Sequence, residues 1–266
     1  MTLEVVIEGI GLWSPALPGW SAGRPILCGE VQPVNAAARP APSLLAPTER
    51  RRAPDSVLLA FEIAQQACAM AAREPGSMPA VFASAWGDLA INDYLCATLV
   101  QSARDISPTK FHNSVHNAPA GYWAIATGCM ASTNAVSAGA ATFAAGLLEA
   151  AVLAAMEDTP VLFAAYDIAA SGPLADVIST RSALGIGLVL APRRERAGAA
   201  LRLRIDADKA AELAPDSAVL HPLHHDNPAA YGLPLLTALA LGEARTLVLP
   251  AGPRTNLNLE ISTWQN

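Results

Sequence analysis

The sequence predicts an α/β fold in which helices cover both faces of a buried sheet. Residues 80–85, apart from Ser84, and residues 161–166 are apolar and alternate with segments of helical periodicity, as expected of strands that are covered on both sides. Apolar residues make up 52% of the 266 residues and charged residues 15%, which is typical of a globular protein with a large core. Because only 5% of residues are aromatic, Ala, Leu, Val and Ile must build that core.

The elements follow from periodicity and from the turn residues between them. In the first half we expect a strand at 4–10, an irregular Pro- and Gly-rich segment at 14–47, a helix that opens at Thr48 or Pro54 and reaches Ala72, the strand 80–85, a helix at 88–102, a loop at 106–113 and a helix near Asn117. In the second half we expect strands at 134–138, 161–166, 181–190, 201–205, 246–249 and 256–261, with helices reaching Met156 and spanning 233–241.

Charge and cysteine content narrow the function classes. A net charge of −6 and a pI near 5.3 argue against nucleic acid as a partner, because phosphate binding needs clustered cations. The basic cluster at 49–52 (ERRR) is interpreted either as a solvated helix start or as a docking patch for an acidic carrier protein. The four cysteines are widely spaced and form no CxxC pair, which favours a reducing compartment, and we expect a cytoplasmic protein.

One segment resembles a membrane span by length. Between residues 138 and 156 the only charged side chain is Glu149. Because most of this run is Ala and Gly, which are weakly apolar, we expect a buried core helix and no membrane span. The N-terminus carries Glu4 and Glu8 without a basic region, so it is interpreted as a first strand and not as a signal peptide.

The stretch 117–149, NAPAGYWAIATGCMASTNAVSAGAATFAAGLLE, has a distinctive layout. Asn117 opens a helix, Gly128 closes a turn, and a short strand meets a small-residue turn before a second helix. Residue 140, which lies 23 positions after Asn117 in that last turn, is alanine, with Gly139 and Ala141 beside it.

This layout resembles the nucleophile segment of the β-ketoacyl synthases, which belong to the thiolase-like superfamily. RRRAPDSVLLAFEIAQQA, VFASAWGD, ISPTKFHNSVHNAPAG and SALGIGLVLAPR are similar to successive family segments, so the resemblance spans roughly residues 4–192. It implies a layered α/β/α thiolase-like fold with a truncated C-terminal half. The chain would be a single ketosynthase-like domain, with residues 1–192 as the N-terminal half and 193–266 as a shortened C-terminal part.

The resemblance also implies a lost chemical step. In the family a cysteine thiolate at the position of Ala140 accepts the acyl chain, and two histidines in HGT-type and GH-type motifs serve the later steps. Neither motif is found here, so we expect no catalytic residue in this chain and no activity by the chain alone. The chain looks most like the N-terminal-half-only proteins found beside full ketosynthases in aryl polyene pigment clusters. That similarity implies a chain length factor, with an active ketosynthase as its partner in a heterodimer and an acyl carrier protein as a further partner.

Interface residues are carried over from the same resemblance. The strand before the nucleophile position pairs across the dimer axis in the family, which points to Thr133, Asn134 and Val136. The loop that enters the Asn117 helix reaches toward the partner's acyl tunnel, which points to Thr109, Phe111, His112 and Asn113. Phe111 is the residue chosen to shape the tunnel end, and an ordinary core phenylalanine is the alternative.

The sequence also allows two other functions. An active acyltransferase or condensing enzyme would use Cys129 or the HPLHHD segment, which contains His221, His224, His225 and Asp226. A homodimeric module that docks an acyl carrier protein is a second alternative. His112 and His116 are four residues apart, but no HExxH motif accompanies them, so we expect neither a metal nor a cofactor.

Overall fold

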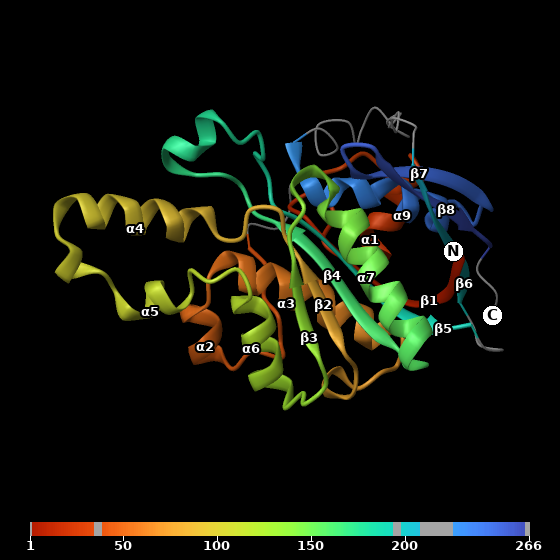
Figure 1. Cartoon of the computed structure of the whole chain (residues 1–266), viewed down its shortest axis with the longest axis horizontal. Coiled ribbons are helices and arrows are strands. Elements are labelled where there is room, and N and C mark those ends of the chain that lie inside the picture. The colour runs from red at the N-terminus through yellow and green to blue at the C-terminus, as the bar shows by residue number, and fades with distance from the viewer. Residues whose placement is uncertain (1, 35–38, 194–197, 208–225, 264–266) are drawn as a thin grey trace.

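A computed structural model describes residues 2–34, 39–193, 198–207 and 226–263. These residues form one eight-stranded sheet in the order β3-β2-β4-β5-β1-β6-β8-β7, with helices on both faces (Figure 1). The strands are β1 (Thr2–Trp13), β2 (Ala80–Ala83), β3 (Thr133–Val136), β4 (Val161–Asp167), β5 (Leu184–Pro192), β6 (Ala199–Ala207), β7 (Arg245–Gly252) and β8 (Thr255–Ile261). The helices are α1 (Trp20–Leu27), α2 (Pro47–Arg52), α3 (Asp55–Met70), α4 (Leu89–Gln101), α5 (Pro108–His112), α6 (Ala118–Thr127), α7 (Thr142–Glu157) and α9 (Leu233–Leu241).

The sheet is mixed in direction. β2 pairs in parallel with both β3 and β4, and the remaining ladders are antiparallel. Every residue of β2 and β4 is buried, which is what a strand covered on both faces requires. β3 lies at one edge of the sheet and β7 at the other.

Alternate residues of each buried strand enter two separate core layers. Val81 of β2 packs in the layer formed with α1, α7 and α9, whereas Phe82 packs in the layer formed with α3 and α6. The predicted α/β class, with helices on both faces of a sheet, is therefore confirmed. Gly146 lets α7 approach the sheet closely, because a Cβ at this position would lie 2.7 Å from Ala83 Cβ and 2.7 Å from Phe163 Cε2.

Three segments differ from the prediction. The 14–47 segment, predicted to be irregular, contains α1, which is held by a hydrogen bond from Arg24 Nε to the carbonyl oxygen of Ala240 at 3.1 Å. Of the two predicted helix starts, Pro54 is confirmed as the N-cap of α3, and Thr48 lies in the separate short helix α2, because Pro54 holds Ala53 in an extended conformation. The predicted loop at 106–113 contains α5, whose N-cap is Ser107, with the Ser107 hydroxyl accepting from Lys110 N.

Helix α7 with the turn before it, Gly139–Glu157, is long and apolar enough to cross a membrane by length and composition. Its buried side packs into the core against β2, β4 and β1, so in this fold it is a core helix. Within this segment, 44% of an apolar 18-residue stretch is buried, so a substantial part of the helix faces outward.

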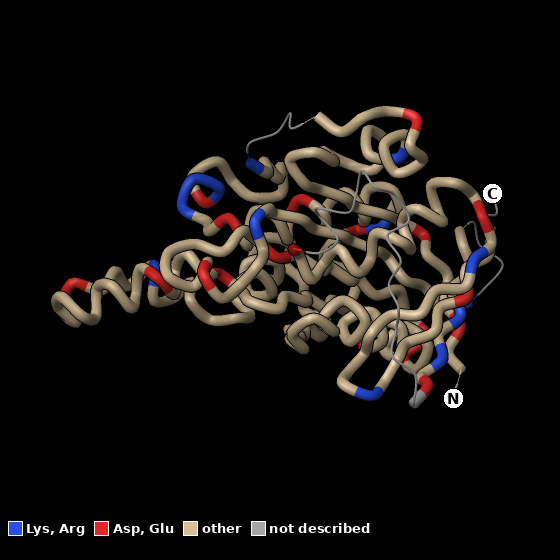
Figure 2. Tube along the Cα trace, turned by 90° about the horizontal axis from the view of Figure 1, so that it is seen from above, with Lys and Arg blue, Asp and Glu red and all other residues tan. Residues whose placement is uncertain are grey.

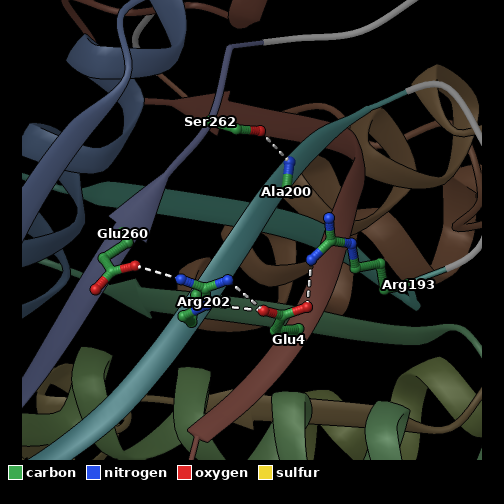
Figure 3. Close-up of polar contacts among 6 residues, drawn as sticks. All are labelled: Glu4, Arg193, Ala200, Arg202, Glu260 and Ser262. Carbon is green, nitrogen blue, oxygen red and sulfur yellow. Dashed lines mark hydrogen bonds and ion pairs between the residues drawn. The ribbon is translucent and has the colours of Figure 1, made fainter.

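The C-terminal strands extend the sheet beyond β1 and bury one face only. In β6, the buried Leu201 and Leu203 alternate with the exposed Arg202 and Arg204, as in antiparallel sheets with one solvated face. On the solvated face, ion pairs join β1, β6 and β8 (Figure 3). Helix α7 packs against both β2 and β7, so the sheet curls around this helix.

Candidate functional site

The turn that carries Ala140 lies between the edge strand β3 and the core helix α7. Gly139, Ala140 and Ala141 form a short 3-10 helix, η3, and Gly139 has a φ of +56°, a left-handed conformation that favours glycine. The Thr142 hydroxyl donates to the carbonyl oxygen of Gly139 at 2.7 Å and accepts from Ala138 N at 2.9 Å. The turn is therefore fixed by its own residues, and it presents the exposed methyl group of Ala140 at the N-terminal end of a 16-residue helix.

The position of Ala140 has the electrostatics that a nucleophile needs. The N-terminus of an α-helix carries a partial positive charge, which stabilises a thiolate or another anion placed there. Alanine offers neither a lone pair nor an ionisable group. Ser137, three residues earlier, directs its hydroxyl hydrogen to the carbonyl oxygen of Ala85 at 3.1 Å and not to a base.

A buried carboxylate, Asp167, holds the loop at residues 84–86, which is hydrogen-bonded to the segment that leads to Ala140. Asp167, at the end of β4, is 1% exposed and accepts from Ser84 Oγ at 2.8 Å, Trp86 N at 3.1 Å and Ala85 N at 3.2 Å. Burial raises the pKa of Asp167 to about 7, against these hydrogen bonds, which lower it. Since Ser137 is bonded to Ala85, the network extends from Asp167 to the segment that carries Ala140.

The C-terminal part of the chain closes the same network. Asn227 is buried and donates through Nδ2 to the carbonyl oxygens of Asp167 at 3.0 Å and Ser182 at 2.8 Å. His116 Nε2 lies 2.8 Å from the carbonyl oxygen of Ser84, so this histidine packs against the 84–87 turn. Sequence reasoning missed Asp167 and Asn227, although a charged residue directly after the apolar run 161–166 is a signal for a polar site at a strand end.

The predicted loop residues lie on an arm that projects from the body (Figures 1 and 2). The arm consists of α4 and α5, and it is held together by Tyr94, whose hydroxyl accepts from Ser107 N at 3.2 Å and whose ring lies 4.0 Å from Lys110 Nζ. Thr109 and His112 are exposed, and Phe111 is 63% exposed, so the alternative of a core phenylalanine is wrong.

Asn113 differs from its neighbours on the arm. It is 4% exposed and accepts a hydrogen bond from the Tyr122 hydroxyl at 3.1 Å, which ties the arm to α6. Helix α6 also packs against β3, where Thr133, Asn134 and Val136 are each half-buried. Thus α6 lies between the two predicted sets of interface residues, which the structure places on the arm and on the sheet edge.

Large apolar side chains are exposed on this side of the molecule. Met130, in the turn before β3, is 96% exposed, and Ile125 of α6 is 85% exposed. Exposed apolar side chains also occur on the arm and just after it: Leu99, Val100, Phe111 and Val115. Large apolar side chains that are exposed to this degree are candidates for contact with another protein.

The alternative nucleophiles of the sequence are Cys129 and the HPLHHD segment. Cys129 is 5% exposed, and its thiol donates to the carbonyl oxygen of Met78 at 3.4 Å, which is the environment of a structural cysteine. His221, His224 and His225 of the HPLHHD segment lie outside the described residues.

One surface cavity adjoins the arm, and another lies near the ion pairs of the C-terminal strands. One of about 490 Å³ is lined by residues of the arm and of the α2–α3 region, including Arg39, Arg52, Asp88 and Thr109. The other, of about 260 Å³, is lined by the ion pairs of Figure 3. There Arg202 bridges Glu4 at 2.6 Å and Glu260 at 2.9 Å, and Arg193 also pairs with Glu4.

The charged side chains around the second cavity compensate one another. Hydrogen bonds from Arg193 and Arg202 lower the pKa of the Glu4 carboxyl, so it stays ionised. Arg193 and Arg202 are therefore each paired with a carboxylate, and the network links neighbouring strands of the sheet.

Comparison with known proteins agrees with this geometry. Residues 28–247 match the family model "Beta-ketoacyl synthase, N-terminal domain", so the chain belongs to that family. No curated protein matches the sequence.

Solved structures with the same fold include complexes of a ketosynthase with a second protein. The ketosynthase ApeO in complex with its chain length factor ApeC from Xenorhabdus doucetiae matches with 21% identity and a TM-score of 0.73, over 97% of this chain and 99% of that chain. The ishigamide ketosynthase/chain length factor matches with 15% identity and a TM-score of 0.72, over 98% and 99%. AntDE:AntF, a type II PKS acyl-carrier protein in complex with its ketosynthase bound to the hexaketide, matches with 12% identity and a TM-score of 0.74, over 99% and 100%. The thiolase-like ketosynthase fold implied by the sequence is confirmed, with matches that cover 97–99% of the chain.

Proposed function

We propose that this chain is a non-catalytic chain length factor that forms a heterodimer with an active β-ketoacyl synthase in type II polyketide biosynthesis. The observation that carries the proposal is Ala140, an exposed methyl group at the helix N-terminus, at the position that the resemblance assigns to the acyl-accepting cysteine. The partner would perform loading, decarboxylation and condensation.

The partner would bind along β3. The outer edge of this strand has no pairing strand among the described residues, since β3 ends the sheet order and pairs only with β2. A free, half-buried edge favours addition of another strand. Thr133, Asn134 and Val136 are the proposed contacts there, and the exposed apolar side chains Ile125 and Met130 extend the same surface.

The arm would reach toward the partner's acyl tunnel. Thr109, Phe111 and His112 are exposed on α5 and free to contact a second chain, whereas the buried Asn113 holds the arm against α6. A bulky side chain at a tunnel end limits chain length, because forcing an extra two-carbon unit into a packed site costs about 1–3 kcal/mol. Phe111 is the proposed limiting side chain, and an aryl polyene is the proposed product class.

An acyl carrier protein is the second proposed partner. Helix α2 carries Arg50, Arg51 and Arg52 beside the 490 Å³ cavity, although the whole chain has a net charge of −6. A local cluster of arginines on an acidic protein suits an acidic carrier domain.

The division of the chain follows from the same proposal. Residues 1–192 would be the ketosynthase-like half and residues 193–266 a shortened second part of a single domain. Support comes from β6, β8 and β7, which extend the sheet of the first part, and from Asn227, which bonds to residues of the first part. We place the protein in the cytoplasm with its partners.

The test is co-expression with an active β-ketoacyl synthase from the same organism, followed by size-exclusion chromatography and an elongation assay. We expect a 1:1 complex that elongates only when both chains are present. Phe111→Ala should lengthen the products, whereas Val34→Ala, which shortens another exposed apolar side chain, should leave product length unchanged. A lone chain that accepts an acyl group on Cys129 would overturn the proposal and make this chain an enzyme in its own right.

A further inference from the structure

The outward side of α7 is an apolar stripe with one charge in it. The residues of this helix that are not buried share one side of the helix, and most are apolar: Ala145, Leu148, Val152, Leu153, Ala155 and Met156. Glu149 lies in the middle of the stripe, with Ala145, Val152 and Met156 at helical spacing around it. Nothing else charged interrupts the stripe before Glu157 at its C-terminal end.

Glu149 is isolated from other charges along the chain as well. From residue 111 to residue 156, a range that includes α6, β3 and α7, it is the only Asp, Glu, Lys or Arg. Its partner in the described residues is a neutral amide, since Asn134 Nδ2 of β3 donates to Glu149 Oε1 at 3.0 Å. A half-buried carboxylate with one amide partner is incompletely compensated, and an opposite charge would stabilise it.

The Asn134–Glu149 pair marks the centre of the proposed interface. Asn134 is the second of the four residues of β3, and Glu149 is the eighth of the sixteen residues of α7. The bond between them places the carboxylate beside the middle of the free sheet edge.

Self-pairing through this edge would bring two such carboxylates together. If a second copy added its β3 antiparallel to this one, the twofold axis would be perpendicular to the sheet and both α7 helices would lie on the same face. A residue near such an axis meets its own copy. Two half-buried Glu149 carboxylates would then repel each other in an apolar contact, where like charges cost most.

We propose that Glu149 determines which chain can pair with this one: it opposes self-association and selects a partner of the same fold with a cationic side chain opposite it. The inference rests on the proposed heterodimer and adds the chemistry that favours it over a homodimer. In the complex, the partner's cation would bond to the carboxylate oxygen that Asn134 leaves free, while the apolar side chains around Glu149 exclude water.

The test is the substitution Glu149→Gln, which keeps the shape and the bond to Asn134 but removes the charge. Sedimentation velocity of the chain alone gives the self-association constant, and titration with the purified ketosynthase gives the heterodimer constant. We expect self-association to strengthen about tenfold and heterodimer formation to weaken about tenfold. Glu157→Gln, at the exposed end of the same helix, is the matched control and should change neither constant.

Opposite shifts separate pairing specificity from a structural role, because a general loss of folding would weaken both associations. Salt provides a check without any variant: raising NaCl from about 50 to 500 mM should strengthen self-association of the wild-type chain and weaken its heterodimer. If the heterodimer forms but Glu149→Gln leaves both constants unchanged, the inference is wrong and the proposed function stands. If the wild-type chain does not bind the ketosynthase, the proposed function fails, and a tight wild-type homodimer would overturn this inference independently.

Discussion

Replacing Gly146 by alanine tests how closely α7 must approach the sheet. The added Cβ would lie 2.7 Å from Ala83 Cβ and 2.7 Å from Phe163 Cε2, whereas carbon atoms pack best at about 3.5–4.0 Å. Both neighbours are fully buried, so about 1 Å of movement must be absorbed inside a packed core. Overpacking of this kind costs about 1–3 kcal/mol.

The same substitution at Gly121 is a matched control. Gly121 lies inside helix α6, is exposed, and has no atom within 4 Å of the position that a Cβ would take. Alanine in a helix interior is favoured over glycine by about 1 kcal/mol, and this gain applies at both sites. We therefore expect Gly121→Ala to stabilise the fold by up to about 1 kcal/mol, and Gly146→Ala, where the steric cost offsets the same gain, to destabilise it by about 0–2 kcal/mol.

Urea denaturation of the three proteins, followed by circular dichroism, measures both changes. The difference between the two variants, about 1–3 kcal/mol, isolates the steric cost because the helix-propensity gain cancels. In thermal unfolding, each 1 kcal/mol corresponds to about 2–4 °C for a chain of this size. Equal stabilisation by both substitutions would show that α7 does not pack on β2 and β4 as described.

Three further predictions concern the site. The free energy of unfolding should fall as pH rises from about 4 to 7, because Asp167 releases its proton near pH 3.8 in the unfolded chain and keeps it to about pH 7 in the folded one. At about 1.4 kcal/mol per pH unit, the loss is about 4 kcal/mol at most. Urea titrations at pH 5, 6, 7 and 8 measure it, and the free energy of unfolding of Asp167→Asn should depend less on pH. In the variant Ala140→Cys, the new thiol should react with iodoacetamide faster than the exposed Cys96, as measured by peptide mass spectrometry, because the helix N-terminus lowers a thiol pKa. The variant chain alone should gain no elongation activity, because the helix N-terminus supplies no acid or base. Arg51→Glu with Arg52→Glu should weaken carrier-protein binding about tenfold at low salt in a fluorescence titration, whereas Arg254→Glu in the β7–β8 turn should not; equal losses would contradict a docking role for α2.

Strands and helices that are buried on all sides were predictable from the sequence. The apolar run at 161–166 became β4, and the helix predicted at 233–241 became α9 with the same bounds, because Gly242 ends it in a left-handed conformation with a φ of 68°. Such segments are specified by their own composition.

Elements that depend on distant partners were harder to predict. Helix α1 contains Pro25, so local preference argues against a helix, and its packing against α9 outweighs that preference. The Glu4–Arg202 ion pair joins residues 198 positions apart, and local sequence gives no indication of it.

The candidate site also has parts that local sequence predicts and parts that depend on tertiary packing. Spacing from Asn117 located the turn at Ala140, since the elements between them are short and ordered. The same spacing gave no means of distinguishing exposed Phe111 from buried Asn113, because their exposure depends on how α5 packs against α6.

The position of β1 governs when the chain can fold during synthesis. Val5 is registered with Pro192 on one side and with Leu201 on the other, so β1 has no partner strand until the chain has been made as far as β5. Until then β1 can pack against the helices α1, α3 and α7, and both of its edges lack a partner strand. Contacts this distant in sequence make folding slow and leave partly folded chains prone to aggregate. Assembly of the central sheet is therefore a late event, and a nascent chain that stops before β5 carries an unpaired β1.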